Sequence, residues 1–384
     1  MRSIAKKIIP VLDLKKQIAP IRDELDSAIK KVIDNTDFIL GSEVCELEKD
    51  VQKYCSVKHA VGVSNGTDAI KLALVALGVG EGEGVICPAF TYYATAGAIA
   101  GMGAVPVFVD IDPLTYNISI QSIKEVLKKK RNFKIKAIIP VHLYGQCADM
   151  EKILELAKKY NLKVIEDTAQ AFGAEYKNKK AGTIGDCGTV SFFPGKNIGA
   201  FGDAGMVLTN TSDVYHKLMI LRNQGNEERY YHTMLGYNHR LDTLQAAILR
   251  VKLKHLDCWN KKRQENAAYF NEKLKGLGIR TPYLAEYSTH IYHQYVLNLE
   301  RSGSNVKLME YLKEKGVDAR VYYPVPLHLQ KCFKYLGYKK GDFPESERAS
   351  VQTLAIPVYP DLTKKELDYI VSSLRAVVVS LRVG

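Results

Sequence analysis

The feature that most constrains the fold of this chain is an alternation of two patterns over its first two-thirds. Short runs rich in β-branched residues, typical of strands, alternate with amphipathic stretches, typical of helices. We expect strands near His59–Val63, Gly84–Cys87, Val105–Asp110, Ala137–Val141, Lys163–Asp167, Thr189–Phe193 and Gly205–Thr209. We expect helices near Thr67–Leu77, Ile120–Lys129, Met150–Tyr160 and Ser212–Arg222. Strands alternating with helices form a mostly parallel sheet covered on both faces, so the predicted fold class is α/β.

The pattern changes at Leu241, where one long predicted helix begins. Its apolar residues approximate a single stripe made of Leu241, Leu244, Ile248, Val251 and Leu256. Such a helix can connect a large domain to a smaller one, and a length of 384 residues fits two domains. We therefore expect residues 1–250 to form the large domain and residues 251–384 a smaller C-terminal domain. Within the latter we expect strands at Val296–Leu299 and Ala319–Tyr322 and helices at Val306–Lys315 and from Lys364.

Several classes of protein are excluded by simple features. The charge-free stretch Gly84–Val109 is interrupted by Pro88, Pro106 and glycines that a membrane-spanning helix does not tolerate, so we interpret it as buried core. The N-terminus lacks a continuous apolar run and a cleavage site, which predicts a cytoplasmic protein with no membrane partner. The seven cysteines are scattered without metal-ligand spacing, which predicts reduced thiols and no metal site.

The lysines and arginines outnumber the acidic residues 54 to 42, for a net charge of +12. This excess is compatible with solvated helix faces, with a nucleic-acid surface, or with a field that attracts a multiply anionic small ligand. The basic residues occur in short helical groups such as Lys128–Arg131, without interleaved aromatic residues or a helix-turn-helix pattern. We therefore favour solvated helix faces first and an anionic substrate second, and we expect no nucleic-acid partner.

Familiar nucleotide motifs do not fit this chain. The glycines between Gly78 and Gly84 have the wrong spacing for a GxGxxG loop. Gly195 and Lys196 are followed by Asn197, and Val190 stands where a P-loop needs glycine. Neither a Rossmann dinucleotide site nor a P-loop is supported.

Four other segments carry chemistry, and we expect each to lie at the C-terminal end of a predicted strand, where open α/β sheets bind ligands. Ser64–Asp68 closes a strand and opens a helix, so free N–H groups, the helix dipole and the Thr67 hydroxyl can form a phosphate cradle. A helix cap without a ligand has the same pattern. Val164–Gln170 ends an apolar strand in Asp167, which places a carboxylate at the sheet edge. Such an acid is more often a cap or a salt-bridge partner.

The third segment, Ser191–Gly199, holds Lys196 in an aromatic and glycine-rich turn. A partly desolvated lysine has a lowered pKa and can form a Schiff base, although a surface lysine is the alternative. The fourth segment, Gly236–Leu241, is a polar loop before the long helix, and in isolation it could be only a capped turn.

Together, in this order and at these separations, the four segments resemble the nucleotide-sugar aminotransferases of fold type I, the pyridoxal-phosphate family often called DegT/DnrJ/StrS. The resemblance extends from Ile9–Leu14 to Tyr323–His328. It implies a large domain with a mostly parallel seven-stranded sheet, a smaller C-terminal α+β domain, and a homodimer with active sites at the interface. It also implies pyridoxal 5'-phosphate as cofactor, with pyridoxamine 5'-phosphate as an intermediate form.

The resemblance also implies roles for single residues. Lys196 would hold the cofactor as a Schiff base, Asp167 would pair with its pyridinium nitrogen, and Gln170 would contact its ring hydroxyl. The other cofactor contacts would be Gly66, Thr67 and Ser191 at the phosphate, Tyr92 on the ring, and Asn238 reaching the phosphate from the neighbouring subunit. The substrate-side residues would be Arg240, Tyr322 and His328.

The chemistry of Asp167 and Lys196 supports these roles independently of the resemblance. A carboxylate that keeps the ring nitrogen protonated lets the cofactor act as an electron sink. Once the amino donor displaces Lys196, the freed amine lies beside the carbon that must lose a proton. It can then act as general base and afterwards as general acid.

The resemblance implies a ping-pong transamination in which L-glutamate supplies the amino group to a nucleotide-diphosphate-linked keto-deoxysugar. Val141–Gln146 looks most like the corresponding segment of enzymes acting on dTDP-3-keto-6-deoxyhexoses, in unusual-sugar, O-antigen or surface polysaccharide biosynthesis. Amination at C4 of a dTDP- or GDP-linked 4-keto sugar is the alternative. A second alternative is a non-catalytic regulatory or nucleic-acid-binding protein on the same fold.

Overall fold

The computed structural model describes residues 8–299 and 304–383. Its main feature is a seven-stranded sheet with the strand order β1-β9-β8-β5-β4-β2-β3. The strands are β1 (His59–Val63), β2 (Gly84–Pro88), β3 (Val105–Val109), β4 (Ile135–Ile138), β5 (Lys163–Asp167), β8 (Cys187–Ser191) and β9 (Gly205–Thr209). β9 runs antiparallel to β1 and β8, and the other neighbouring strands run parallel. The predicted mostly parallel α/β sheet is therefore confirmed.

Predicted and observed strand ends differ most at β4 and β8. β4 ends at Ile138 rather than at Val141, because Pro140 has no N–H with which to continue the ladder. β8 ends at Ser191 rather than at Phe193, since a tight turn follows at once.

Helices cover both faces of the sheet, because alternate side chains of each strand point to opposite faces. On one face, Val61 and Val85 belong to a core shared with α4, α5 and α8. On the other face, Ile86 packs in a core with α6 and α7, and Ala60 packs in a core with α3. These helices are α3 (Ser42–Cys55), α4 (Gly66–Ala76), α5 (Tyr93–Gly101), α6 (Ile120–Lys128), α7 (Met150–Tyr160) and α8 (Ser212–Arg222).

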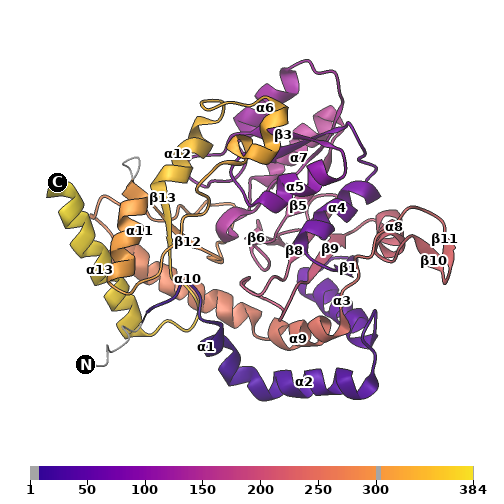
Figure 1. The fold of residues 1–384 in the computed structure, drawn as a ribbon, viewed down its shortest axis with the longest axis horizontal. Helices are drawn as coiled ribbons and strands as arrows, with labels where there is room; N and C mark the ends of the chain where they lie inside the picture. Colours follow the sequence, from indigo (N-terminus) through magenta and orange to yellow (C-terminus); the bar gives the residue numbers. More distant parts are fainter. Residues whose placement is uncertain (1–7, 300–303, 384) are drawn as a thin grey trace.

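The long helix predicted from Leu241 is instead two helices, α9 (Thr243–Leu253) and α10 (Leu256–Lys273). They meet at Lys254 and His255, and the predicted apolar stripe is buried or half-buried along its length. α9 packs against α3 and against α2 (Arg22–Asn35), which lies along the lower edge of Figure 1. α10 leads into the C-terminal elements.

The C-terminal elements surround a separate hydrophobic core, at the left of Figure 1. It contains β12 (Tyr295–Asn298) paired antiparallel with β13 (Thr353–Ile356), and the nearby helices are α11 (Ser304–Glu314), α12 (Pro344–Gln352) and α13 (Lys364–Val383). The predicted strand Ala319–Tyr322 is not formed. Arg320 makes an isolated bridge to Ala355, but the carbonyl of Tyr322 accepts a hydrogen bond from the Tyr144 hydroxyl, which directs the chain toward the main sheet. The domain boundary after residue 250 stays a prediction.

The remaining elements are short. They are α1 (Leu14–Ile18), η1 (Ala19–Ile21), η2 (Leu143–Gly145), β6 (Glu175–Tyr176), β7 (Lys179–Lys180), β10 (Asn226–Glu228), β11 (Tyr231–His232), η3 (Leu327–Leu329) and η4 (Lys331–Leu336). The β10–β11 hairpin projects from the body at the right of Figure 1. Within the described residues, no helix combines the length and the apolar character needed to cross a bilayer.

Candidate active site

The predicted phosphate cradle, Asp167 and the turn that carries Lys196 follow strands whose carboxyl ends meet at one edge of the main sheet. β1, β5 and β8 point the same way, because β1 and β8 both run antiparallel to β9 and β8 pairs parallel with β5. β1 is followed by Ser64–Asp68, β5 ends at Asp167, and β8 ends at Ser191. Open α/β sheets bind their ligands at this edge.

Asp167 is the buried acid of this edge, with 5% of its surface exposed. The Thr95 hydroxyl, on α5, donates to Asp167 Oδ2 at 2.9 Å, and the Ala169 N–H donates to Oδ1 at 3.1 Å. Burial raises the pKa of Asp167, whereas these hydrogen bonds and the positive charge of Lys196 lower it. The carboxylate is fixed in orientation and is suited to pair with a cationic ring nitrogen.

Lys196 lies half-buried in the turn after β8. Burial lowers its pKa to about 8, and the negative charge of Asp167 opposes this effect. An amine with such a pKa is partly deprotonated near neutral pH and can attack a carbonyl carbon. The turn itself is tight, since a Cβ on Gly199 would lie 2.2 Å from the Pro194 carbonyl oxygen. Buried Lys252, on α9, donates to the Gly199 carbonyl and braces the turn.

The N-terminus of α4 meets the end of β8 and forms the expected cradle. A Cβ on Gly66 would lie 2.7 Å from the Cβ of Ser191, so the close approach requires glycine. Asn65 Oδ1 accepts from the Asp68 N–H at 2.9 Å, while the N–H groups of Gly66 and Thr67 precede the first intrahelical bond. Thr67 is exposed beside them. Backbone N–H groups at the positive end of a helix, with a hydroxyl at their side, suit a phosphate.

The Gly236–Leu241 segment forms the other wall of this region. The prediction that it follows a strand of the main sheet was wrong, because it lies between the β10–β11 hairpin and α9. Asn238 is exposed and makes a backbone bridge to Asn223, and Arg240 Nη1 donates to Asn223 Oδ1 at 3.4 Å. A cavity between this segment and the cradle is lined by Ile39, Ser64, Asn65, Gly202, Asp203, Asn238, Arg240, Asp242 and Gln245. Asn238 and Arg240 therefore border the same cavity as the residues that begin α4.

Gln170 and Tyr92 border the site on its other side. The Tyr144 N–H donates to Gln170 Oε1 at 2.8 Å, and Gln170 Nε2 donates to the Tyr323 hydroxyl at 2.9 Å. These bonds orient the amide, and the second N–H of Nε2 can serve a ring hydroxyl. Tyr92, just before α5, is 59% exposed, and its ring centroid lies 6.2 Å from that of Tyr323. An exposed aromatic face at the rim suits stacking on a flat ligand.

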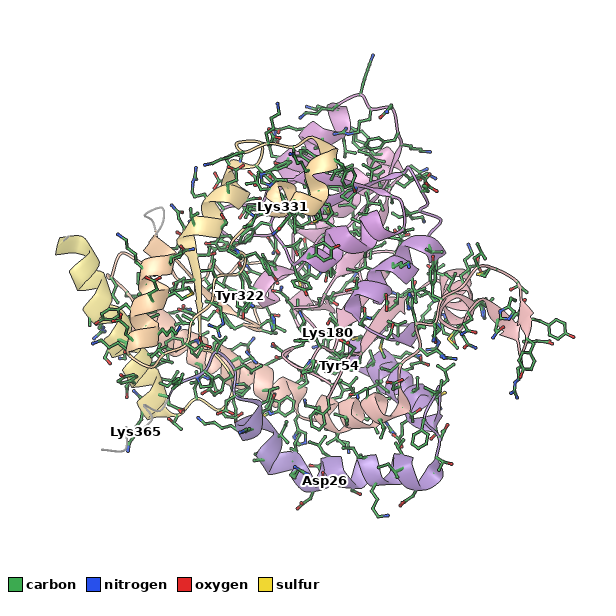
Figure 2. All side chains as sticks on the ribbon, in the orientation of Figure 1. Asp26, Tyr54, Lys180, Tyr322, Lys331 and Lys365 are labelled. Carbon is green, nitrogen blue, oxygen red and sulfur yellow. The ribbon has the colours of Figure 1, made fainter. Side chains whose placement is uncertain are left out.

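Tyr322 and His328, the two predicted substrate-side residues of the C-terminal elements, lie in different surroundings. Tyr322 is half-buried and lies near the middle of the molecule, between the C-terminal elements and the main sheet (Figure 2). His328 is 2% exposed, its Nε2 lies 3.0 Å from Glu347 Oε1, and its ring packs edge-on against Phe343. The structure therefore brings Tyr322 toward the site and directs the His328 ring into the packing around α12.

Sequence reasoning missed the residues that hold the predicted ones. Thr95 fixes Asp167, Tyr323 fixes Gln170, and Tyr144 contacts both Gln170 and the Tyr322 carbonyl. One signal existed for Thr95, a β-branched polar residue one helical turn after Tyr92 in an alanine-rich helix, where its helix propensity is poor.

A buried acid next to Asp167 also escaped the sequence analysis. The Glu166 carboxylate is fully buried and accepts from the N–H groups of Gly182, Ile184 and Gly185. His142 Nε2 donates to it at 2.9 Å; the proton lies on Nε2 because His142 Nδ1 accepts from a backbone N–H. These bonds satisfy the carboxylate internally, so Glu166 anchors the end of β5 and leaves Asp167 as the acid that faces the site.

Comparison with known proteins identifies the family. The sequence model of the DegT/DnrJ/EryC1/StrS aminotransferase family matches residues 20–375. A pleiotropic regulatory protein of Geobacillus stearothermophilus is 46% identical over 95% of this chain and 97% of its own length. A UDP-N-acetyl-3-dehydro-α-D-glucosamine 3-aminotransferase of Acidithiobacillus ferrooxidans is 42% identical over 96% of this chain and 97% of its own. The structure of S. venezuelae DesV with a ketimine intermediate is 37% identical, with a TM-score of 0.93 over 97% of this chain and 99% of that chain.

The residues present fit pyridoxal 5'-phosphate, since a glycine cradle for the phosphate lies on the same sheet edge as a buried carboxylate and a lysine with a lowered pKa. A structure from Bacillus subtilis with bound pyridoxamine phosphate is 32% identical to this chain, with a TM-score of 0.89 over 98% of this chain and 86% of that chain. The chain belongs to the DegT/DnrJ/EryC1/StrS aminotransferase family and is a pyridoxal-phosphate-dependent sugar aminotransferase.

Proposed function

We propose that this enzyme aminates a dTDP-3-keto-6-deoxyhexose with L-glutamate as donor, in the cytoplasm, on a route to a surface polysaccharide or another unusual sugar. A dTDP-3-amino-3,6-dideoxy-α-D-galactopyranose transaminase of Aneurinibacillus thermoaerophilus, 40% identical over 96% of this chain, supports the choice. Other relatives of 36–42% identity are named for UDP-, dTDP- and GDP-linked sugars. Amination at C4 of a dTDP- or GDP-linked sugar is therefore the alternative.

The transamination chemistry in this proposal rests on the placement of Asp167 and Lys196 at one sheet edge, each with a shifted pKa, and the choice of sugar rests on the relative named above. When bound, the cofactor supplies a conjugated electron sink for the reacting carbon. Asp167 would hold a proton on the ring nitrogen, for which Thr95 and the Ala169 N–H fix its carboxylate. Lys196 would hold the cofactor covalently at rest and, when released, would move the proton at the carbon that bears the amino group.

The remaining residues would bind and orient. The N–H groups of Gly66 and Thr67, with the Ser191 hydroxyl, would hold the cofactor phosphate, and Gln170 would hold the ring hydroxyl. Tyr92 would cover the ring face and exclude water from it. Arg240 and Tyr322 would meet the nucleotide sugar, and the net charge of +12 would favour its diphosphate.

A homodimer would complete the phosphate side of the site. Phe38, Ile39 and Phe201, which are 44%, 50% and 42% exposed, are large apolar side chains, and Ile39 also lines the cavity beside the cradle. Exposed apolar side chains next to a functional cavity are typical of a subunit interface. In a dimer, the exposed Asn238 of one subunit would reach the cofactor phosphate of the other.

The relative named as a pleiotropic regulatory protein makes a non-catalytic regulator the second candidate. A regulator of this kind would not need both Asp167 and Lys196 in competent positions. Retention on DNA that weakens with salt, without amination of any sugar, would favour the regulator.

The test is incubation of the purified protein with ¹⁵N-labelled glutamate and a panel of dTDP-, UDP- and GDP-linked 3-keto and 4-keto sugars. We expect ¹⁵N at C3 of a dTDP sugar, located by mass spectrometry and NMR. Lys196→Ala should abolish transfer, while Lys254→Ala, a change at an exposed lysine on the α9–α10 junction, should leave it intact. Amination at C4, or of another nucleotide sugar, would replace the proposed substrate, and equal transfer by Lys196→Ala would refute the mechanism.

A further inference from the structure

The segment His290–Gln294 lies against the turn that carries Lys196 and is held by other parts of the chain. From α10, Arg263 Nη1 donates to the Tyr292 carbonyl at 3.1 Å. From η2, the Gly145 carbonyl accepts from the Ile291 N–H at 2.9 Å. Gly145 has φ +109°, and a Cβ there would lie 2.9 Å from the His293 nitrogen, so the approach is tight. The position of the segment is thus fixed by both α10 and η2.

Asn197, the residue after Lys196, joins this segment to the lysine. Its Nδ2 donates to the Ile291 carbonyl at 3.2 Å and to Asn260 Oδ1 at 2.7 Å. A backbone carbonyl can only accept, so the orientation of the Asn197 amide is determined. Asn197 Oδ1 then lies 3.1 Å from His293 Nδ1. Because that oxygen can also only accept, the ring proton of His293 lies on Nδ1.

The surroundings of His293 keep its imidazole neutral. Burial lowers its pKa well below the ordinary value, and the positive charges of Lys196 and Arg263 lower it further. The other charged group that acts on Lys196 is Asp167, on β5. The neutral ring carries its proton on Nδ1 and donates it to Asn197 Oδ1.

We propose that His293 is a positioning residue for Lys196: its Nδ1–H fixes the Asn197 side chain, and Asn197 fixes the turn from which the lysine projects. The inference rests on the role proposed above for Lys196. A neutral donor suits this place, because a protonated ring would add a positive charge beside an amine that must itself take up a proton. His293 acts through Asn197 and does not need to touch the reacting atoms.

The first test measures Lys196 in the cofactor-free protein. His293→Asn keeps an N–H donor near the position of Nδ1, whereas His293→Phe keeps a ring and removes the donor. The rate at which acetic anhydride labels Lys196, followed by peptide mass spectrometry across pH, reports the pKa of its amine. We expect a midpoint at about 8 in the wild type and in His293→Asn. In His293→Phe the midpoint should rise toward 10.5, because a loosened turn admits water to the amine.

The second test uses the loaded enzyme. Misplacement of the lysine in His293→Phe should lower kcat by roughly 10- to 100-fold with little change in the KM for glutamate, and His293→Asn should stay within about threefold of the wild type. Asn197→Ala breaks the same bond from its other end and keeps the test available if His293→Phe does not fold. Because Asn197→Ala also removes the bonds to Ile291 and Asn260, it should cost more than His293→Phe, and adding His293→Phe to it should cause no further loss.

Wild-type labelling and turnover in folded His293→Phe would overturn the inference, as would a His293→Asn variant as defective as His293→Phe. Additive losses in the double variant would also overturn it. Borohydride reduction of the wild type separates this failure from failure of the proposed function. An adduct found away from Lys196 would refute the proposed mechanism. An adduct on Lys196, together with His293 variants whose Lys196 labelling and turnover match the wild type, would refute only the positioning role.

Discussion

The two halves of the active site are built on different principles. Around Asp167 the site is closed, since the carboxylate is 5% exposed and two donors from its own chain fix it. Around the cradle the site is open, since Thr67 and Asn238 are exposed and the facing wall is a polar loop. In the closed half both donors to Asp167 belong to one chain, and the open half borders a cavity.

The difference reflects the interactions that each half uses. A carboxylate that must hold a proton on a ring nitrogen acts strongly only where water is excluded, so it belongs in the interior of a sheet edge. A phosphate can be held by backbone N–H groups at a helix end, which remain effective near solvent. The closed half is therefore expected to govern turnover, and the open half to govern cofactor affinity and assembly.

Asp167→Asn is the most direct test of whether the closed half governs turnover. The amide cannot hold the ring nitrogen in its protonated state, so we expect kcat to fall by roughly 10³-fold while the cofactor still binds. Stopped-flow half-reactions with glutamate, together with the cofactor content of the purified variant, measure the two effects separately. A variant that loses cofactor but turns over normally when saturated would show that the closed half governs binding instead.

Asn238→Ala tests the open half and its expected completion by a second subunit. Loss of a hydrogen bond to a charged phosphate should weaken cofactor affinity by about 10-fold or somewhat more, with kcat at saturating cofactor nearly unchanged. Equilibrium dialysis of the cofactor measures the affinity.

The interface itself is tested by mixing Asn238→Ala with Lys196→Ala after reversible dissociation. The mixture is assayed at a cofactor concentration that leaves Asn238→Ala largely unsaturated. If the partner's Asn238 completes each site, every mixed dimer contains one site with both residues intact and regains turnover. No gain over the sum of the two separate samples would place Asn238 in the site of its own chain.

The same division explains how much could be predicted from the sequence. Periodicity located the strands and most helices that flank the site. Asp167, Lys196 and Gly66 each had a local signal, at a strand end or in a glycine turn, that was weak alone, and the order of the segments and the family resemblance supplied their roles. Thr95 and Tyr323 have little local sequence signal, because their importance depends on where distant segments meet. Thr95 reaches Asp167 across 72 positions of sequence, and Gln170 reaches Tyr323 across 153.

For a related reason, the sequence did not predict the break between α9 and α10 or the orientation of the His328 ring. The apolar stripe continues through Lys254 and His255, so hydrophobic spacing alone does not show that the helix is interrupted there. The family resemblance placed His328 among the substrate-side residues, although a histidine beside prolines is more often a packing residue. Its ring is instead directed by Glu347 and Phe343, which only the packing of α12 brings to it.

Thr95→Val tests whether the closed half depends on its internal donor. The Thr95 hydrogen bond lowers the pKa of Asp167, so its removal raises that pKa, and a larger share of the acid is protonated at a given pH. Activity needs the ionised carboxylate, so the acid limb of the kcat/KM profile should move to higher pH. At neutral pH we expect a loss of about 10-fold. Thr95→Ser, which keeps the hydroxyl, should restore the wild-type limb; an unshifted limb in Thr95→Val would show that the Ala169 N–H suffices.

Tyr323→Phe should have the smallest effect, because it removes a neutral hydrogen bond that orients Gln170 without touching its other contact, the Tyr144 N–H. The expected loss in kcat/KM is about two- to tenfold, the range for one neutral bond. Gln170→Ala should cost more and should hide any further effect of Tyr323→Phe, since the hydroxyl acts through the amide. If Tyr323→Phe still lowered turnover in the Gln170→Ala background, the Tyr323 hydroxyl would have a direct role, and the closed half would extend to the C-terminal elements.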